Sequence, residues 1–117
     1  MPNDVMGLDD TELDDLFQAL ADPTRRAVVE RLGHGPASTS QLAEPFAMAL
    51  PSFTQHLAVL ERCGLVTSAK AGRVRTYRLA PERLESAEHW LTAQRRVWQQ
   101  RLDQFDTYVR NMKENPE

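Results

Sequence analysis

Residues 51–66 read PSFTQHLAVLERCGLV, and this stretch decides the fold of the chain. Its apolar stripe, together with the residue just before it, recurs at spacings of three and four: Leu50, Phe53, Leu57 and Leu60. This spacing predicts an amphipathic helix whose apolar side faces a core. Gly64 suits the left-handed position that ends a helix, and we expect a strand to begin immediately after it.

The outward positions near the start of this helix carry small or planar hydrogen-bonding side chains: Ser52, Thr54, Gln55 and His56. Lys and Glu, which are common on solvent-facing helix surfaces, are absent until Glu61. Side chains that donate and accept hydrogen bonds suit a helix that reads base edges in the major groove. The alternative is a polar face that touches only water, because Ser, Thr and Gln are common surface residues.

The composition, with 117 residues, 41% hydrophobic and 26% charged, predicts a single domain spanning 1–117. No apolar run approaches the roughly 20 residues of a membrane span. The acidic start of the chain also lacks the basic region of a signal peptide. Cys63 is the single cysteine, which excludes an internal disulfide and fits a reducing compartment. We therefore expect a cytoplasmic protein that makes no membrane contact.

The net charge of −3 argues superficially against nucleic acid, but the charges are unevenly distributed. Residues 1–22 hold seven acidic residues and no basic residue. Residues 23–80 hold eight basic residues against three acidic ones, a local charge of +5. Phosphate binding depends on the local field, so the middle of the chain is the candidate surface.

Two helices are expected at the start of the chain. The first covers about 10–21, because its apolar residues recur with helical spacing: Leu13, Leu16, Phe17 and Leu20. Asp22 and Pro23 fit the N-cap and first position of a second helix. The glycine and proline cluster at 33–36 stops that helix.

A short third helix follows, for which Ser38, Thr39 or Ser40 can provide the cap. Pro45 predicts that it ends early or bends. A short connection then leads to the helix described first, which Pro51 in its first turn fixes to begin near residues 49–51. Two helices joined in this way predict a helix-turn-helix over 38–63.

A β-hairpin is expected over 65–79, with strands at Leu65–Lys70 and Val74–Leu79 around Ala71-Gly72. Three basic residues lie at its tip: Lys70, Arg73 and Arg75. A basic hairpin beside a helix-turn-helix is a wing that can rest on phosphates or enter a minor groove. The alternative is an edge hairpin whose charges only prevent aggregation, but the clustering of bases at the tip favours the wing.

A long final helix is expected over 82–112, opened by Pro81-Glu82. Its apolar residues follow a seven-residue repeat with two interleaved positions: Leu84, Leu91, Trp98, Leu102, Phe105, Val109 and Met112. So small a domain cannot cover that stripe, and a second copy of the chain is the simplest partner. The predicted fold class is therefore mainly α with a small β-hairpin, forming a homodimer through its N- and C-terminal helices. The predicted interface residues are Leu13, Leu16, Phe17, Leu84, Leu91, Trp98, Leu102, Phe105 and Val109, and packing inside one subunit is the alternative.

Four segments together resemble the ArsR/SmtB family of bacterial winged helix-turn-helix regulators. They are FQALADPTRRAVVERL at 17–32, STSQLAEPF at 38–46, LPSFTQHLAVLERCGLV at 50–66 and AGRVRTYRL at 71–79. They cover roughly residues 13–80 in the family's order and spacing, and the long closing helix fits as well. The resemblance implies a dimeric repressor that binds double-stranded DNA. Its site would be an imperfect inverted repeat near its own promoter, released on a signal.

Carried onto this chain, the resemblance implies base reading by four residues: Ser52, Thr54, Gln55 and, through packing, Pro51. It implies phosphate contacts from six others: Ser38, Thr39, Ser40, Gln41, His56 and Arg62. The implied wing contacts fall on Lys70, Arg73 and Arg75.

The sequence departs from the family pattern in two places. Ala49 stands where a serine often caps the recognition helix, and replacing such a cap by alanine can cost about 1 kcal/mol. Ala71 and Val74 occupy wing positions that are often charged, which puts the strength of the wing contact in doubt.

Metal-sensing members of the family carry paired cysteines in the third helix, or His and carboxylate ligands along the last. Here the third helix has no cysteine, and the last offers only His89, with Glu85 and Glu88 nearby. A zinc site wants three or four ligands, so we predict no metal and no other cofactor. Cys63 is expected to be an inert, buried thiol, with a redox switch as the alternative. The sequence leaves a small-molecule effector open.

These observations predict a sequence-specific DNA-binding transcriptional regulator, most simply a dimeric and autoregulatory repressor. The alternative is a winged-helix module that binds an acidic protein partner and has little DNA specificity. An enzyme is not expected, because the sequence has no glycine-rich phosphate loop, no metal cluster and no nucleophile–base pair that can be placed together.

Overall fold

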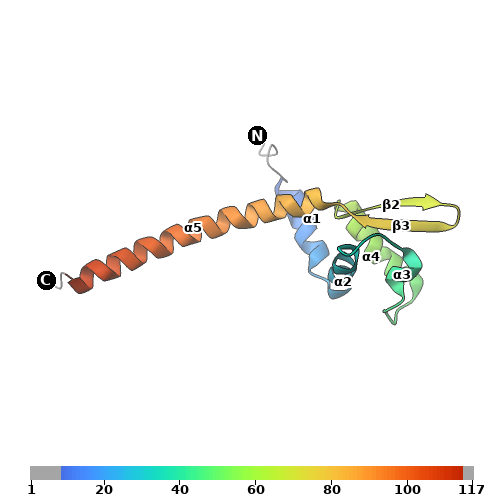
Figure 1. Cartoon of the computed structure of the whole chain (residues 1–117), viewed down its shortest axis with the longest axis horizontal. Helices are drawn as coiled ribbons and strands as arrows, with labels where there is room; N and C mark the ends of the chain where they lie inside the picture. Colours follow the sequence, from blue (N-terminus) through green and yellow to red (C-terminus); the bar gives the residue numbers. More distant parts are fainter. Residues whose placement is uncertain (1–8, 115–117) are drawn as a thin grey trace. The chain divides into compact units, whose positions relative to one another are not determined.

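The computed structural model describes residues 9–114, so the ends of the predicted domain, 1–8 and 115–117, lie outside the described residues. The chain divides into two compact units, Met1–Ala87 and Glu88–Glu117, and each is described by itself. The first unit contains the elements α1 Asp10–Leu20, α2 Pro23–Leu32, β1 Ala37–Ser38, α3 Thr39–Ala43, α4 Leu50–Arg62, β2 Val66–Ala71 and β3 Val74–Leu79 (Figure 1). The last helix, α5 Pro81–Glu114, begins in the first unit and makes up the described part of the second.

Side-chain caps fix where the first helices begin. The carboxylate of Asp9 accepts a hydrogen bond from the backbone N–H of Glu12 at 2.8 Å, and the Glu12 side chain accepts one from the Asp9 N–H in return. Asp22 caps α2 by accepting from the backbone N–H of Arg25 at 3.1 Å, with Pro23 at the first helical position. The predicted cap at Asp22 is thus confirmed, as is the end of α2 before Gly33.

The core of the first unit is built from one side of each helix and the inner face of the sheet. Its fully buried members are Leu16, Ala19, Val28, Phe53, Leu57, Leu60, Leu65 and Val66. Phe53 at its centre packs against Phe46, with ring centroids 5.4 Å apart. Burial of α4 through Phe53, Leu57 and Leu60 confirms most of the predicted stripe and holds the polar side of that helix outward.

Leu50 corrects the rest of that prediction, because its side chain is 55% exposed. It is the first residue of α4, one turn before Phe53, and α3 already ends at Ala43. Leu50 thus lies one turn outside the buried part of the stripe, which begins at Phe53.

The sheet contains one more strand than the sequence predicted. β2 and β3 form the expected hairpin, with Ala71 paired to Val74 around a turn in which Gly72 has φ +63°. The additional strand β1 pairs antiparallel with β3, placing Ala37 opposite Tyr77, so the order is β1-β3-β2. Strand β1 was not predicted, because two residues are too few to show the alternation of apolar and polar side chains that is typical of a strand. The start of β2 at Val66 lies one residue later than expected.

Two predicted interface residues belong instead to the interior of the first unit. Leu16 is completely buried and Leu13 is 9% exposed, because both face the core beneath α1. Neither offers a surface to a second chain. Phe17, on the same helix, is 36% exposed.

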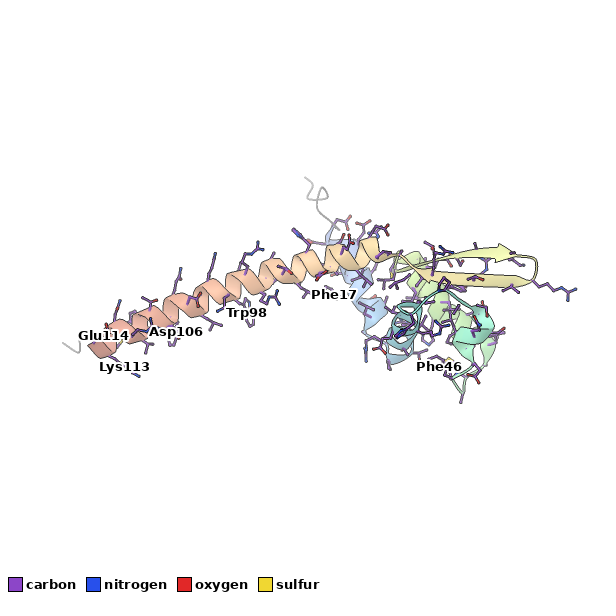
Figure 2. All side chains as sticks on the ribbon, in the orientation of Figure 1. Phe17, Phe46, Trp98, Asp106, Lys113 and Glu114 are labelled. Atoms are coloured by element: carbon purple, nitrogen blue, oxygen red, sulfur yellow. The ribbon has the colours of Figure 1, made fainter. Side chains whose placement is uncertain are left out.

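The second unit is the continuation of α5, and its apolar side chains lie on the surface of the single chain. The exposed ones are Trp90, Leu91, Val97, Trp98, Leu102, Phe105, Tyr108 and Met112. Trp98, labelled in Figure 2, is 71% exposed. Across residues 9–114, no helix is long and apolar enough to cross a membrane.

The cap of α4 gives the first testable prediction. Ala49 has the extended backbone of an N-cap, with φ −63° and ψ 142°, but no side-chain bond to the helix. Ala49→Ser should supply that bond and raise the free energy of unfolding by about 1 kcal/mol, measured by urea denaturation. Ala47→Ser, in the exposed turn before the cap, is the matched control; an equal gain from both would contradict the capping explanation.

Candidate nucleic-acid interface

The N-terminal half of α4 presents the predicted base-reading residues on its outer side. Ser52 and Gln55 are exposed, and their side chains make no hydrogen bond or ion pair with the part of the chain that the structure describes. Thr54 is half-buried, and its hydroxyl donates to the carbonyl of Pro51 at 3.0 Å, which leaves its oxygen able only to accept. Pro51 is exposed one residue before Ser52. These four residues therefore form one accessible polar patch.

Some of the predicted phosphate contacts in the α3 region already form hydrogen bonds within the chain. Ser38 and Gln41 form a capping box, in which Ser38 Oγ accepts from the Gln41 N–H at 3.2 Å and Gln41 Oε1 accepts from the Ser38 N–H at 2.8 Å. Thr39 is half-buried at the start of α3, and burial raises the pKa of Tyr77 on β3. Ser40 is exposed. The Gln41 amide nitrogen and the Ser40 hydroxyl remain available to an outside partner.

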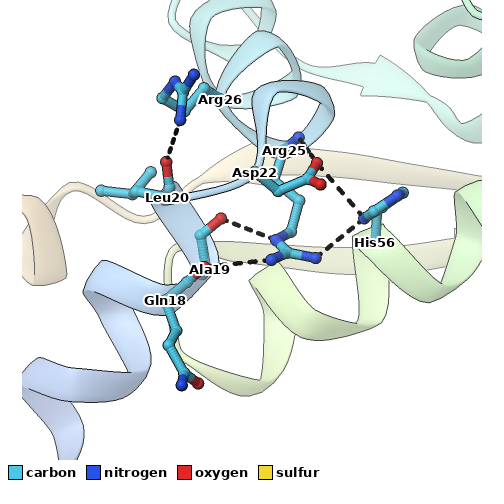
Figure 3. Close-up of polar contacts among 7 residues, drawn as sticks. All are labelled: Gln18, Ala19, Leu20, Asp22, Arg25, Arg26 and His56. Atoms are coloured by element: carbon cyan, nitrogen blue, oxygen red, sulfur yellow. Dashed lines mark hydrogen bonds and ion pairs between the residues drawn. The ribbon is translucent and has the colours of Figure 1, made fainter.

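His56, another predicted phosphate contact, is part of a polar network that joins α4 to α2 and α1 (Figure 3). Its Nδ1 accepts a hydrogen bond from Arg25 Nη1 at 3.0 Å. The same guanidinium donates through Nε to the carbonyl of Ala19 at 2.8 Å and through Nη2 to that of Gln18 at 3.2 Å. Arg25 thus ties the end of α1 to α4.

Sequence reasoning missed Arg25. Two of its partners are backbone carbonyls, which no side-chain pattern reveals, and His56 lies 31 positions away. Arg26, its neighbour, donates to the carbonyl of Leu20 at 2.8 Å. The one available signal was the pair of arginines directly after the predicted cap of α2, because helix-end carbonyls favour nearby cations.

The predicted wing residues differ in whether their side chains are hydrogen-bonded to other described residues. Arg73 lies in the turn and Lys70 pairs in register with Arg75, one step before the tip. Neither the Lys70 nor the Arg73 side chain is bonded to any described residue. Arg75 Nη1 donates to Ser68 Oγ at 2.9 Å, and Ser68 Oγ donates to Glu61 Oε2 at 2.9 Å. Ser68 thereby links the hairpin to α4, and Arg75, which is bonded to Ser68, is not wholly available to an outside partner.

Arg62, another predicted phosphate contact, is the last residue of α4 and lies six residues after His56, about 9 Å along the helix. It lines a cavity of about 340 Å³ with Asp15, Gln18, Arg25, Val59 and Cys63. Burial raises the pKa of the Cys63 thiol, which keeps it protonated at neutral pH, as an inert cysteine requires. The inertness itself stays a prediction. Across residues 9–114, no group of three or more His, Cys, Asp and Glu is arranged to hold a metal ion.

Comparison with known proteins agrees with this arrangement. A family model described as a helix-turn-helix domain matches residues 20–69. The HTH-type transcriptional regulator Rv2034 of Mycobacterium tuberculosis is 48% identical over 68 residues, which are 58% of this chain and 64% of that protein. This chain therefore spans less than two thirds of the length of Rv2034. The transcriptional repressor SdpR of Bacillus subtilis is 28% identical over 79 residues, covering 68% of this chain and 88% of SdpR.

A winged helix-turn-helix is the class of protein that this fold defines. A crystal structure of an ArsR family transcriptional regulator superposes with a TM-score of 0.76 at 48% identity, over 80% of this chain and 96% of that one. The chain belongs to the ArsR family of winged helix-turn-helix transcriptional regulators. That family consists of regulators and not of enzymes.

The network around Asp22 gives a prediction for the dependence of stability on pH. Although burial alone would raise it, the pKa of the Asp22 carboxyl lies below its ordinary value of 3.8, because the backbone N–H of Arg25 and the nearby His56 and Arg25 side chains favour the carboxylate. A lowered folded-state pKa stabilises the fold above about pH 4, and this contribution disappears as the pH falls through the folded value.

The test compares the wild type with Asp22→Asn, which retains a capping side chain but has no charge. Urea unfolding between about pH 7 and pH 3 should give a lower stability for the variant at neutral pH and converging stabilities in acid. A constant difference at every pH would contradict the assignment.

Proposed function

We propose that this chain is a sequence-specific DNA-binding transcriptional regulator, acting as a homodimeric repressor at an inverted-repeat operator. The observation that carries the proposal is the free polar patch on α4, because a helix with exposed hydrogen-bonding side chains beside a basic hairpin suits the major groove. Membership of the ArsR family supports it. SdpR is named a repressor, which supports the direction of control.

In the proposed complex, Gln55 reads a base edge, since its amide can donate and accept at the same time. Ser52 adds a hydroxyl, Thr54 contributes an acceptor and Pro51 contributes packing. Phe53 and Leu57 hold this surface in place, because both are completely buried on the opposite side of the helix. The patch is therefore presented by a rigid element, as direct readout requires.

Phosphate contacts come from both sides of α4 in this proposal. Lys70 and Arg73 at the wing supply unpaired positive charge, and charge near the phosphates provides affinity without sequence preference. Ser40, the Gln41 amide and His56 supply neutral donors on the other side. Arg75 has a smaller role than the sequence suggested because it is bonded to Ser68.

The apolar side of α5 supports a homodimer. Leu91, Trp98, Leu102 and Phe105 follow heptad spacing, and each is at least half exposed in the single chain. A helix that leaves so many large apolar side chains in water needs a partner, and an identical helix has the matching repeat. Phe17 on α1 adds an exposed aromatic residue, and Val109 a half-buried aliphatic one. Leu84 packs against the core of the first unit and is a secondary candidate.

The division between base reading and phosphate binding can be tested with two variants. Gln55→Ala should lose about 1–3 kcal/mol of discrimination at particular bases and little elsewhere. Arg73→Gln should weaken all sequences similarly and reduce the salt dependence by about one unit of slope per protomer. Both effects can be measured by binding each variant to a randomised DNA pool at several salt concentrations.

Gln100→Ala, on the exposed surface of α5, is the control and should behave as the wild type. Identical profiles for Gln55→Ala and Arg73→Gln would overturn the assignment of roles. Wild-type binding that neither selects a sequence nor weakens with salt would instead favour the alternative function, a module that binds an acidic protein.

A charged substitution in the apolar stripe of α5 tests the proposed dimer. Leu102→Glu should shift the chain from dimer to monomer in sedimentation equilibrium, because a carboxylate would be buried without a partner at the interface. Its DNA affinity should fall, since two half-sites would no longer be bound together. Gln100→Glu adds the same charge off the stripe and should remain dimeric; a monomeric wild type at micromolar concentration would refute the proposal.

A further inference from the structure

We infer that Arg25 is a positioning residue for the DNA contact of His56. It fixes the imidazole in the tautomer that carries its proton on Nε2, and this N–H is the group that donates to a phosphate. The inference rests on the proposed function, in which α4 lies against DNA.

The first step follows from the chemistry of the contact. Arg25 Nη1 and His56 Nδ1 are 3.0 Å apart. A guanidinium nitrogen can only donate, so Nδ1 must accept through its lone pair. A neutral imidazole carries a single N–H, which must then be on Nε2. Protonating Nδ1 would break this bond and place a second cation beside the guanidinium.

The second step concerns the other charged group that faces the ring. Asp22 Oδ2 lies 3.8 Å from Nδ1, beyond hydrogen-bond distance, and the Asp22 carboxylate already accepts from the Arg25 backbone. A carboxylate would favour a proton on Nδ1, whereas the guanidinium excludes one. The two groups that α2 and its cap bring to His56 therefore favour opposite tautomers, and the shorter contact belongs to Arg25.

The third step is that the guanidinium is itself held. Arg25 donates to the carbonyls of Ala19 and Gln18 at the end of α1, which fixes the plane of its fork. In Figure 3 the second ring nitrogen of His56 points away from both Arg25 and Asp22. The His56 side chain is 23% exposed, and His56 lies one helical turn after Ser52, on the same side of α4. The Nε2–H is thus directed to the surface that the proposal assigns to DNA.

Nitrogen-15 NMR of the imidazole in the full chain tests the tautomer directly. At about pH 8, wild-type His56 should show a single Nε2–H form. Arg25→Met removes the donor and should increase the Nδ1–H form, because Asp22 is then the nearest polar partner. Arg26→Met, which removes a neighbouring arginine that also bonds α1 but not His56, should leave the tautomer unchanged.

An Nδ1–H form in the wild type would overturn the inference, and so would an unchanged tautomer in folded Arg25→Met. Equal changes in Arg25→Met and Arg26→Met would also overturn it. If Arg25→Met does not fold, the wild-type spectrum and a pair of His56 variants decide the question.

The pair of variants separates the two ring nitrogens by function. Gln places its amide nitrogen near the position of Nε2, and Asn near that of Nδ1. His56→Gln should retain operator affinity within about twofold, whereas His56→Asn should lose about threefold to tenfold per protomer, the effect of one hydrogen bond. The salt slope should be unchanged in both, because a neutral donor releases no counterion.

Equal losses in both variants would refute the role of Nε2. A wild-type chain that binds no DNA sequence preferentially would refute the proposed function instead, and the tautomer measurement would then still report on Arg25 alone. The two failures are therefore distinguishable.

Discussion

The guanidinium of Arg25 is the contact that joins the three helices α1, α2 and α4. The carbonyls in the last turn of α1 lack their full set of helical partners, and a cation placed there adds a donor and suits the negative end of the helix dipole. Arg25 provides that cation from α2 and extends to His56 on α4. Because Asp22 both caps α2 and lies beside His56, one short segment connects the start of α2, the end of α1 and the polar side of α4.

The core and this polar network both hold α4 in place. Phe53, Leu57 and Leu60 are completely buried and fix the rotation of the helix about its axis. With the apolar side so constrained, Ser52 and Gln55 are directed outward without needing any contact of their own. The hairpin is attached separately, through the bonds from Arg75 to Ser68 and from Ser68 to Glu61. The residues proposed to read bases and to bind phosphates therefore belong to elements that these contacts hold together.

Most of the fold of the first unit was predictable because its signals are local. Helical spacing, the Asp22-Pro23 cap and the glycine at 72 each depend on a few adjacent residues, and the structure contains the elements they predict. The features that were not predicted depend instead on contacts between distant parts of the chain. Strand β1 exists only through pairing with β3, Leu50 is exposed although its spacing places it on the apolar stripe, and Arg25 acts on carbonyls and on a residue 31 positions away. The exposed site residues on α4 and the wing were accessible to pattern reasoning, whereas their supporting contacts were not.

The central claim is that a rigidly held polar patch on α4 reads DNA in a two-fold symmetric protein. Selection of bound fragments from a random double-stranded DNA pool by the purified full chain, followed by sequencing, tests it most directly. The account predicts enrichment of an inverted repeat whose half-sites are centred about one helical turn apart, roughly 34 Å. Enrichment of no sequence, or of a single half-site without symmetry, would contradict it.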